Sequence, residues 1–128
     1  MIVAGVGCRR GAAAPDIEAA IRAALAHAGV AANALDCIAT AAAKRDEPGI
    51  EAAAAKFGLS VVLVEQPELA AAAPRTMTRS ARVLALTGTP SVAEAAALAA
   101  AGPAARLIAT RLVCGAATCA LAASERAP

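Results

Sequence analysis

Residues 2–29, IVAGVGCRRGAAAPDIEAAIRAALAHAG, decide the fold, because they place a short apolar run directly before a run with helical spacing. The apolar residues 2–6 predict a β-strand, and the glycine-rich residues 7–11 predict the loop that follows it. From Ile17 to Leu25, large apolar side chains recur every fourth residue, after a proline suited to the first turn of a helix and before a glycine suited to its end. This stretch therefore predicts one strand–loop–helix unit.

The same alternation continues along the chain. Further strands are predicted at residues 35–40, 60–64, 106–110 and 116–122. Helices are predicted at residues 48–57, 67–73 and 90–101. Periodicity leaves residues 82–86 between strand and helix, with a short helix favoured. Residues 61–64, VVLV, form a continuous apolar run of the kind buried on both faces, which favours a parallel sheet.

We therefore expect an α/β fold with an open, mostly parallel sheet of about five strands and helices on both faces. A turn at Gly115 would make the last two strands a hairpin-like pair. The 128 residues and the 29 side chains of Val, Ile, Leu, Met and Phe suit one core, although 43 alanines inflate the hydrophobic fraction of 59%. We assign residues 1–124 to a single domain and residues 125–128 to a short tail.

Composition excludes several classes of function. The chain has one Phe and no Trp or Tyr, so it lacks the π-faces needed to stack nucleic-acid bases or to cage a cation. A net charge of +2 is too small for a nucleic-acid or membrane surface. No alanine-rich run reaches the length of a membrane span without a charge or a proline. We therefore expect neither nucleic-acid nor membrane partners.

The N-terminal and cysteine patterns indicate a reducing compartment. The apolar N-terminus is too short for a signal peptide and has no basic region before it. Cys8, Cys37, Cys114 and Cys119 form no CxxC pair and have no histidine at ligand spacing, which predicts no metal site. Four cysteines could form two disulfides, but a chain without a signal peptide indicates a reducing cytosol, where we expect free thiols. We therefore expect a cytoplasmic protein that holds neither a metal nor a cofactor.

One topological rule brings the polar segments together. In a parallel sheet with right-handed crossovers, the loops that leave the carboxyl ends of the strands lie along one edge. Residues 7–11, 40–49 and 110–111 leave such ends. Residues 87–91 open the helix before the fourth strand, and they join the others if they bend over the same edge. The four segments would then form one candidate site.

The first of these segments suits an anion. Its glycines allow a sharp turn with exposed N–H groups, and Arg9 and Arg10 add charge just before a helix N-terminus. The GxGxxxG spacing of residues 5–11 is neither a dinucleotide fingerprint nor a Walker A motif, so a phosphate or nucleotide site is the weaker interpretation. A tight turn with two solvated arginines is the structural alternative. Cys8 could have a lowered pKa here, although a small residue that fills the turn is the simpler interpretation.

The signals for acid–base catalysis are weak. Thr89 before a proline, or Ser91 with Glu94 in a capping box, would cap the helix that follows. Capping accounts for Glu94, and no histidine or second carboxylate lies near it in sequence, so Glu94 and Glu47 are only weak catalytic candidates. His27 is alone on a predicted helix surface, and no nucleophile triad is recognisable. The catalytic residues therefore stay unassigned.

Three motifs carry a resemblance to a known family. They are residues 5–11; Ala39-Thr40 with Lys44, Asp46, Glu47, Pro48 and Gly49; and residues 88–98, GTPSVAEAAAL. In this order they resemble the CobE family, which is similar to the C-terminal domain of the cobalamin-biosynthesis protein CbiG. The resemblance covers nearly the whole chain. The lysine that usually follows the fourth strand in this family is replaced by Arg111, which keeps the charge and changes the geometry.

The resemblance implies a role in building the corrin ring, in the aerobic branch for a chain that stands alone. CbiG-type proteins hydrolyse a ring lactone and release a two-carbon fragment, and this chain has room only for their C-terminal portion. Precorrins are large macrocycles with many acetate and propionate carboxylates, which suit arginines, a lysine and backbone N–H donors. The implied partners are a precorrin or corrinoid intermediate and other cobalamin-pathway enzymes.

We expect four basic side chains to clamp carboxylates, with loop backbones as secondary donors and Glu47 orienting Lys44. These side chains are Arg9, Arg10, Lys44 and Arg111. The complete candidate binding set is Gly7, Cys8, Arg9, Arg10, Gly11, Thr40, Lys44, Glu47, Gly88, Thr89, Ser91 and Arg111. A non-catalytic binder that carries a precorrin is favoured over a hydrolase or isomerase that acts on the macrocycle. A phosphate- or nucleotide-binding domain is the weakest of the three alternatives.

Overall fold

The structure, a computed structural model, describes residues 1–77 and 91–125. Its strands are β1 (Ile2–Cys8), β2 (Cys37–Ala41), β3 (Val61–Val64), β4 (Arg106–Cys114) and β5 (Ala117–Ala123). Its α-helices are α1 (Ala14–Ala28), α2 (Pro48–Phe57), α3 (Gln66–Ala72) and α5 (Val92–Ala101), and 3₁₀ turns lie at Ala32–Ala34, Ala42–Lys44 and Ala73–Arg75. None of these helices is long and apolar enough to cross a membrane. The helix predicted at residues 82–86 lies outside the described residues.

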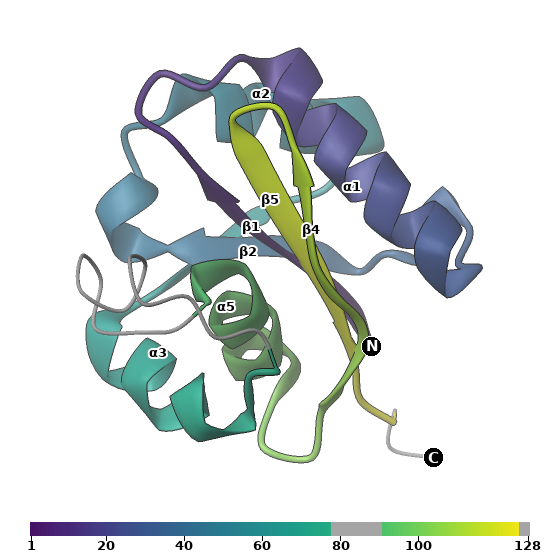
Figure 1. The fold of residues 1–128 in the computed structure, drawn as a ribbon, viewed down its shortest axis with the longest axis vertical. Helices are drawn as coiled ribbons and strands as arrows, with labels where there is room; N and C mark the ends of the chain where they lie inside the picture. The colour runs from purple at the N-terminus through teal and green to yellow at the C-terminus, as the bar shows by residue number, and fades with distance from the viewer. Residues whose placement is uncertain (78–90, 126–128) are drawn as a thin grey trace.

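The described strands form one five-stranded sheet in the order β3-β2-β1-β5-β4 (Figure 1). β1 pairs in parallel with β2, and β2 pairs in parallel with β3. β5 runs antiparallel to both β1 and β4, and the turn before it contains Gly115 with a φ of 57°. The predicted α/β fold with a C-terminal hairpin is therefore confirmed, and the antiparallel β5 makes the sheet mixed.

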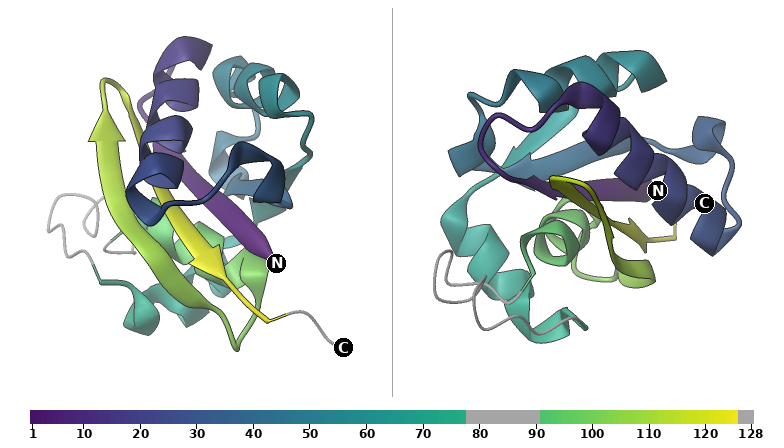
Figure 2. Two further views of the ribbon diagram at one scale, coloured as in Figure 1. Left: turned by 90° about the vertical axis from the view of Figure 1, so that its right-hand side faces the viewer. Right: turned by 45° about the horizontal axis from the view of Figure 1, so that its top comes forward.

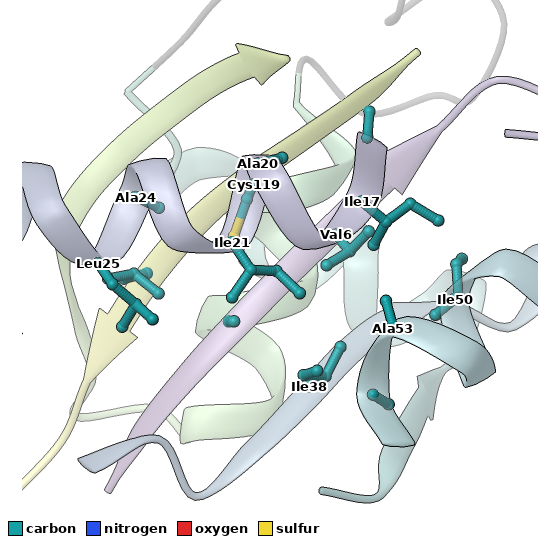
Figure 3. Packing of buried hydrophobic residues seen from close by; sticks show 14 of the residues in the cluster. Val6, Ile17, Ala20, Ile21, Ala24, Leu25, Ile38, Ile50, Ala53 and Cys119 are labelled. Carbon is teal, nitrogen blue, oxygen red and sulfur yellow. The ribbon is translucent and has the colours of Figure 1, made fainter. Parts of the chain in front are cut away.

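Helices cover both faces of the sheet. α1 and α2 lie on one face, and α3 and α5 lie on the other (Figure 2). The apolar side chains of α1, from Ile17 to Leu25, pack over Val6 of β1 and Ile38 of β2 (Figure 3). Ile50 of α2 extends this cluster. The helical spacing read from the sequence is therefore the spacing that fills the core.

Local sequence explains where the helices begin and end. A proline occupies the first turn of both α1 and α2, where its missing N–H costs nothing. Gly29 and Gly58 end these helices with φ angles of 69° and 68°, a left-handed conformation that favours glycine. Of the two caps predicted for α5, Ser91 is observed, and its Oγ accepts a hydrogen bond from the Glu94 N–H at 3.3 Å.

α5 lies in close contact with β1. A Cβ atom at Gly5 would collide with the Ala93 carbonyl oxygen and would approach the Ala97 Cβ to 2.8 Å. The buried residues of α5 are mostly alanines, which present only methyl groups to the sheet. Because Gly5 has no side chain, the two backbones can approach each other. The alanine-rich composition thus allows helices to pack near a sheet that has few large side chains.

Two strand predictions are wrong in part. β3 is an edge strand, so Val62 and Leu63 are 39% and 40% exposed instead of buried on both faces. β4 continues past its predicted end to Cys114, because it keeps pairing with β5 through two register shifts. Residues 110–111 therefore lie within a strand, and they are not part of a loop that leaves it.

Candidate functional site

Four strands end at the same edge of the sheet. β1, β2 and β3 are parallel, and β4 has their direction because both β1 and β4 are antiparallel to β5. Their last residues are Cys8, Ala41, Val64 and Cys114. The segments that follow these residues share one rim of the molecule, which we call the carboxyl edge. Ligands of open α/β sheets bind at this kind of edge.

A buried carboxylate joins the first two loops of the carboxyl edge. Glu47, just before α2, is only 9% exposed and accepts the Gly11 N–H with Oε2 at 2.9 Å and Oε1 at 3.3 Å. Gly11 has a φ of 73°, a conformation that favours glycine. In the described part of the chain, no ion pair links Glu47 to Lys44. Residues 9–12 and 42–47 are therefore held together, and we call them the joined loops.

Cys8 lies beside the charges of the second loop. Burial raises the pKa of its thiol above the ordinary value of 9.0, the Lys44 ammonium lowers this pKa in part, and the Glu47 carboxylate raises it further. A lowered pKa for Cys8, one of the two interpretations of the sequence, is therefore wrong, because removal from water outweighs the nearby positive charge. The two charge effects also place Cys8, Lys44 and Glu47 in one neighbourhood.

Three basic side chains of the joined loops, those of Arg9, Arg10 and Lys44, belong to the predicted binding set. Arg9 and Arg10 are exposed, and Lys44 is partly exposed. None of the three forms an ion pair within residues 1–77 and 91–125. The N–H groups of Arg9 and Gly11 already have acceptors within the protein. An anion at this edge would therefore bind mainly to charged side chains. The first loop has few N–H groups left to donate to it.

Three other residues of the predicted binding set lie beneath the carboxyl edge. Thr40 is 1% exposed, and its Oγ donates a hydrogen bond to a β1 carbonyl at 2.8 Å. Ser91 is fully buried as the cap of α5. Gly7 is buried within β1, where a Cβ would approach a threonine Oγ of β5 to 2.8 Å. Two further members of the set, Gly88 and Thr89, lie outside the described residues.

Arg111 and Glu94 form a separate cluster on the α5 face. Glu94 belongs to α5, and Arg111 lies in β4 next to a register shift in the pairing of β4 with β5. The fully buried Glu94 carboxylate accepts the N–H groups of Met77 at 2.6 Å and of Arg111 at 2.9 Å. The structure therefore holds Arg111 within β4 and does not bring it into the joined loops.

Reasoning from the sequence missed a pocket that is lined in part by residues 42–43 and 45–46 of the joined loops. The pocket has a volume of about 340 Å³ and is bounded by the ends of β2 and β3 and the start of α3. Its lining residues are Ala41, Ala42, Ala43, Arg45, Asp46, Val64, Glu65, Gln66 and Leu69. Arg45 forms an ion pair with Glu65 at 3.7 Å. The rule that groups segments after strand ends could have found this pair, because each residue follows a carboxyl end.

Comparisons of the sequence with known proteins agree with one another. Residues 2–122 match the family described as Cobalamin synthesis G C-terminus. Protein CobE from a Sinorhizobium species is 41% identical over 121 residues, which cover 94% of this chain and 79% of that protein. The similarity therefore extends over both loops of the candidate site.

Solved structures of cobalamin-biosynthesis proteins have the same fold. A crystal structure of CobE gives a TM-score of 0.90 at 37% identity and covers 98% of this chain and 93% of that chain. The protein chiG from Agrobacterium tumefaciens str. C58 gives 0.78 at 50% identity, over 98% of this chain and 100% of that chain. A putative cobalamin biosynthesis protein G homolog from Sulfolobus solfataricus gives 0.70 at 22% identity, and this match covers 37% of its length. The last similarity is one of fold alone.

Proposed function

Because the chain belongs to the Cobalamin synthesis G C-terminus family and acts in cobalamin biosynthesis, we propose that it binds a precorrin or corrinoid intermediate through the carboxylates of the macrocycle. One observation carries this proposal. The joined loops present Arg9, Arg10 and Lys44 at the carboxyl edge, and these side chains have no ion-pair partner among the described residues. The carboxylates of acetate and propionate arms can bind these side chains, because hydrogen bonds between charged groups are stronger than hydrogen bonds between neutral groups.

The proposed contacts are made to the rim of the macrocycle. With one Phe and no Trp or Tyr, the chain can contribute little stacking to a flat ring, so aliphatic contact would hold the ring face. Each charged hydrogen bond to a carboxylate contributes about 1.5 to 3 kcal/mol. Three such bonds total about 4.5 to 9 kcal/mol, which corresponds to a Kd between about 0.5 mM and just below 1 μM before the cost of association is counted. Aliphatic contact with the ring face would therefore have to add to the contribution of the three basic side chains.

We propose a carrier in preference to an enzyme. Glu47 and Glu94, the two candidates for a catalytic acid or base, are buried. Glu47 accepts the N–H group of Gly11, and Glu94 accepts those of Met77 and Arg111. The Cys8 thiol is a poor nucleophile at neutral pH because its pKa is raised. Hydrolysis or isomerisation of the macrocycle is the competing function. A carrier would work in the cytoplasm, where other cobalamin-pathway enzymes supply and take over the intermediate.

A carrier and an enzyme differ in what happens to the ligand. We expect purified protein, incubated with a late precorrin, to change the absorption spectrum of the ligand while the mass of the ligand stays the same. We also expect the protein to purify coloured from cells that make corrin precursors. A new ligand mass that accumulates over many turnovers would contradict the carrier and support the enzyme.

Replacing Lys44 tests the contribution of one charge. Lys44→Ala should weaken binding of a tetrapyrrole intermediate by about 1.5 to 3 kcal/mol, which raises the Kd about 10- to 150-fold. The visible and near-ultraviolet absorption of the ligand gives the Kd, and the near-ultraviolet range is free of interference because the chain contains no Trp or Tyr. Lys56→Ala, on the exposed last turn of α2, is the matched control and should leave the Kd unchanged. An unchanged Kd for Lys44→Ala would remove Lys44 from the site.

A further inference from the structure

We propose that the pocket bounded by β2, β3 and α3 is a subsite for a neutral carboxamide arm of the ligand. This inference rests on the proposed function, because the arm would belong to the macrocycle whose carboxylates meet the joined loops. The subsite adds a second kind of recognition to the carboxyl edge. The basic side chains of the joined loops would bind arms that end in a carboxylate, and the pocket would bind an arm that ends in a carboxamide.

The position and size of the pocket suit one arm of a larger ligand. The pocket and the joined loops share the 3₁₀ turn Ala42–Lys44, of which Ala42 and Ala43 line the pocket. The charge of Lys44, at the end of the same turn, lowers the pKa of the Cys8 thiol in part, so Lys44 lies near the end of β1. A ligand that spans this turn would therefore reach both places. A volume of about 340 Å³ is at the lower end of the range for small-molecule sites, so the pocket would hold a side arm but not the ring.

The charged groups of the pocket suit a ligand group that both donates and accepts hydrogen bonds. Arg45 is a donor only; its Nε is bonded to the Ala42 carbonyl at 3.1 Å, which fixes the guanidinium near the pocket wall. Asp46 and Glu65 carry carboxylates, which only accept when ionised. The ion pair of Arg45 with Glu65 is long, at 3.7 Å, and the two side chains are 57% and 62% exposed. A ligand group can therefore enter between them at low cost.

A carboxamide matches these groups, whereas a carboxylate does not. The oxygen of a primary amide can accept from Arg45 while its NH₂ group donates to Asp46 or Glu65. A carboxylate would gain the contact with Arg45 but would face two groups of its own charge, which oppose its binding. The buried side chains of Val64 and Leu69 form an apolar wall for the methylene groups of the arm. The pocket would therefore distinguish an amidated arm from a free one.

Two small probes test the subsite directly. We expect propionamide, titrated into the whole ¹⁵N-labelled chain, to shift the amide resonances of Ala43 and Glu65 and to bind at least about fivefold more tightly than propionate. The double variant Asp46→Asn, Glu65→Gln should reverse this preference, because it removes the repulsion and leaves the charge of Arg45. Lys56→Ala, on the exposed last turn of α2, is the control that should keep the preference of the wild-type protein.

The outcomes separate this inference from the proposed function. Equal or tighter binding of propionate, or no shift at the pocket with either probe, would overturn the subsite. A parallel titration with cobyrinic acid, a corrin whose arms end in carboxylates, tests the joined loops. Binding of cobyrinic acid without a preference for propionamide would overturn the subsite alone. A preference for propionamide without any corrinoid binding would support a carboxamide site and would overturn its assignment to a macrocycle.

Discussion

Glu94 shows how one residue connects distant parts of the fold. Its carboxylate is fully buried and accepts the N–H groups of Met77 and Arg111, while its own N–H bonds to Ser91. Charge-assisted hydrogen bonds replace the water that a buried carboxylate loses. The capping role could be read from the S-x-x-E spacing, but each backbone partner of the carboxylate is 17 residues away in sequence. No local pattern predicts such partners.

Removing this carboxylate should destabilise the protein strongly. We expect Glu94→Ala to lower the free energy of unfolding by about 2 to 4 kcal/mol, because two backbone N–H groups lose their acceptor. Urea denaturation followed by circular dichroism measures this change. Glu18→Ala, which breaks the exposed ion pair with Arg22, is the control and should cost no more than about 0.5 kcal/mol. Equal losses for the two variants would show that Glu94 has no special structural role.

At the scale of elements, the contact of α5 with β1 depends on a residue without a side chain. We expect Gly5→Ala to lower the free energy of unfolding by about 3 kcal/mol, because its Cβ would meet the Ala93 carbonyl oxygen and force the helix away. Gly58→Ala is a control of a different kind. Gly58 has a φ of 68° and open space around it, so this change should cost only about 1 kcal/mol of backbone strain. Thermal and urea unfolding of both variants test the order of the two effects.

The elements that the sequence predicts well are those with their own start and stop signals. α1 and α2 begin with a proline in the first turn and end at a glycine, so local rules locate them closely. The end of β4 is different, because pairing with β5 carries the strand to Cys114 past a charged residue. The exposure of β3 depends on its place at the edge of the sheet, which the apolar run VVLV does not encode. Tertiary pairing, not propensity, sets both features.

At the scale of the whole molecule, buried thiols should make the fold sensitive to alkali. Burial raises the pKa of the Cys119 thiol, with a smaller contribution from the charge of Cys114, and burial also raises the pKa values of Cys8 and Cys37. In the unfolded chain these thiols ionise near their ordinary value of 9.0. The unfolded state therefore binds fewer protons than the folded state above this pH, and stability falls as the pH rises.

This effect can be measured by urea denaturation between pH 7 and about pH 10.5, a range that covers the ordinary ionisation of cysteine. For Cys119 the decrease should approach about 1.4 kcal/mol per pH unit once the pH exceeds the pKa of the unfolded thiol. Cys119→Ala should be less stable at pH 7 because of the space it leaves, but its stability should fall less steeply with pH. The same slope in both proteins would contradict the account.

The candidate site could be predicted only in part, because it depends on how separate units are arranged. The rule for strand ends predicts that residues 7–11 and 40–49 leave the same edge, and the bond from Gly11 to Glu47 joins them. The raised pKa of Cys8 rules out the less favoured of its two interpretations, because burial at the end of β1 is not visible in the sequence. The pocket was missed because it requires the position of α3 relative to β2 and β3.

The claim that the joined loops bind carboxylates is tested most directly by titrating cobyrinic acid into two proteins. These are the wild-type chain and the triple variant Arg9→Ala, Arg10→Ala, Lys44→Ala, with the visible absorption of the corrin as the signal. We predict that the wild-type protein binds and that added salt weakens binding, because the contacts are between exposed charges. We also predict that the triple variant has the same free energy of unfolding and binds at least about 100-fold more weakly. Equal affinity of the two proteins would contradict the account.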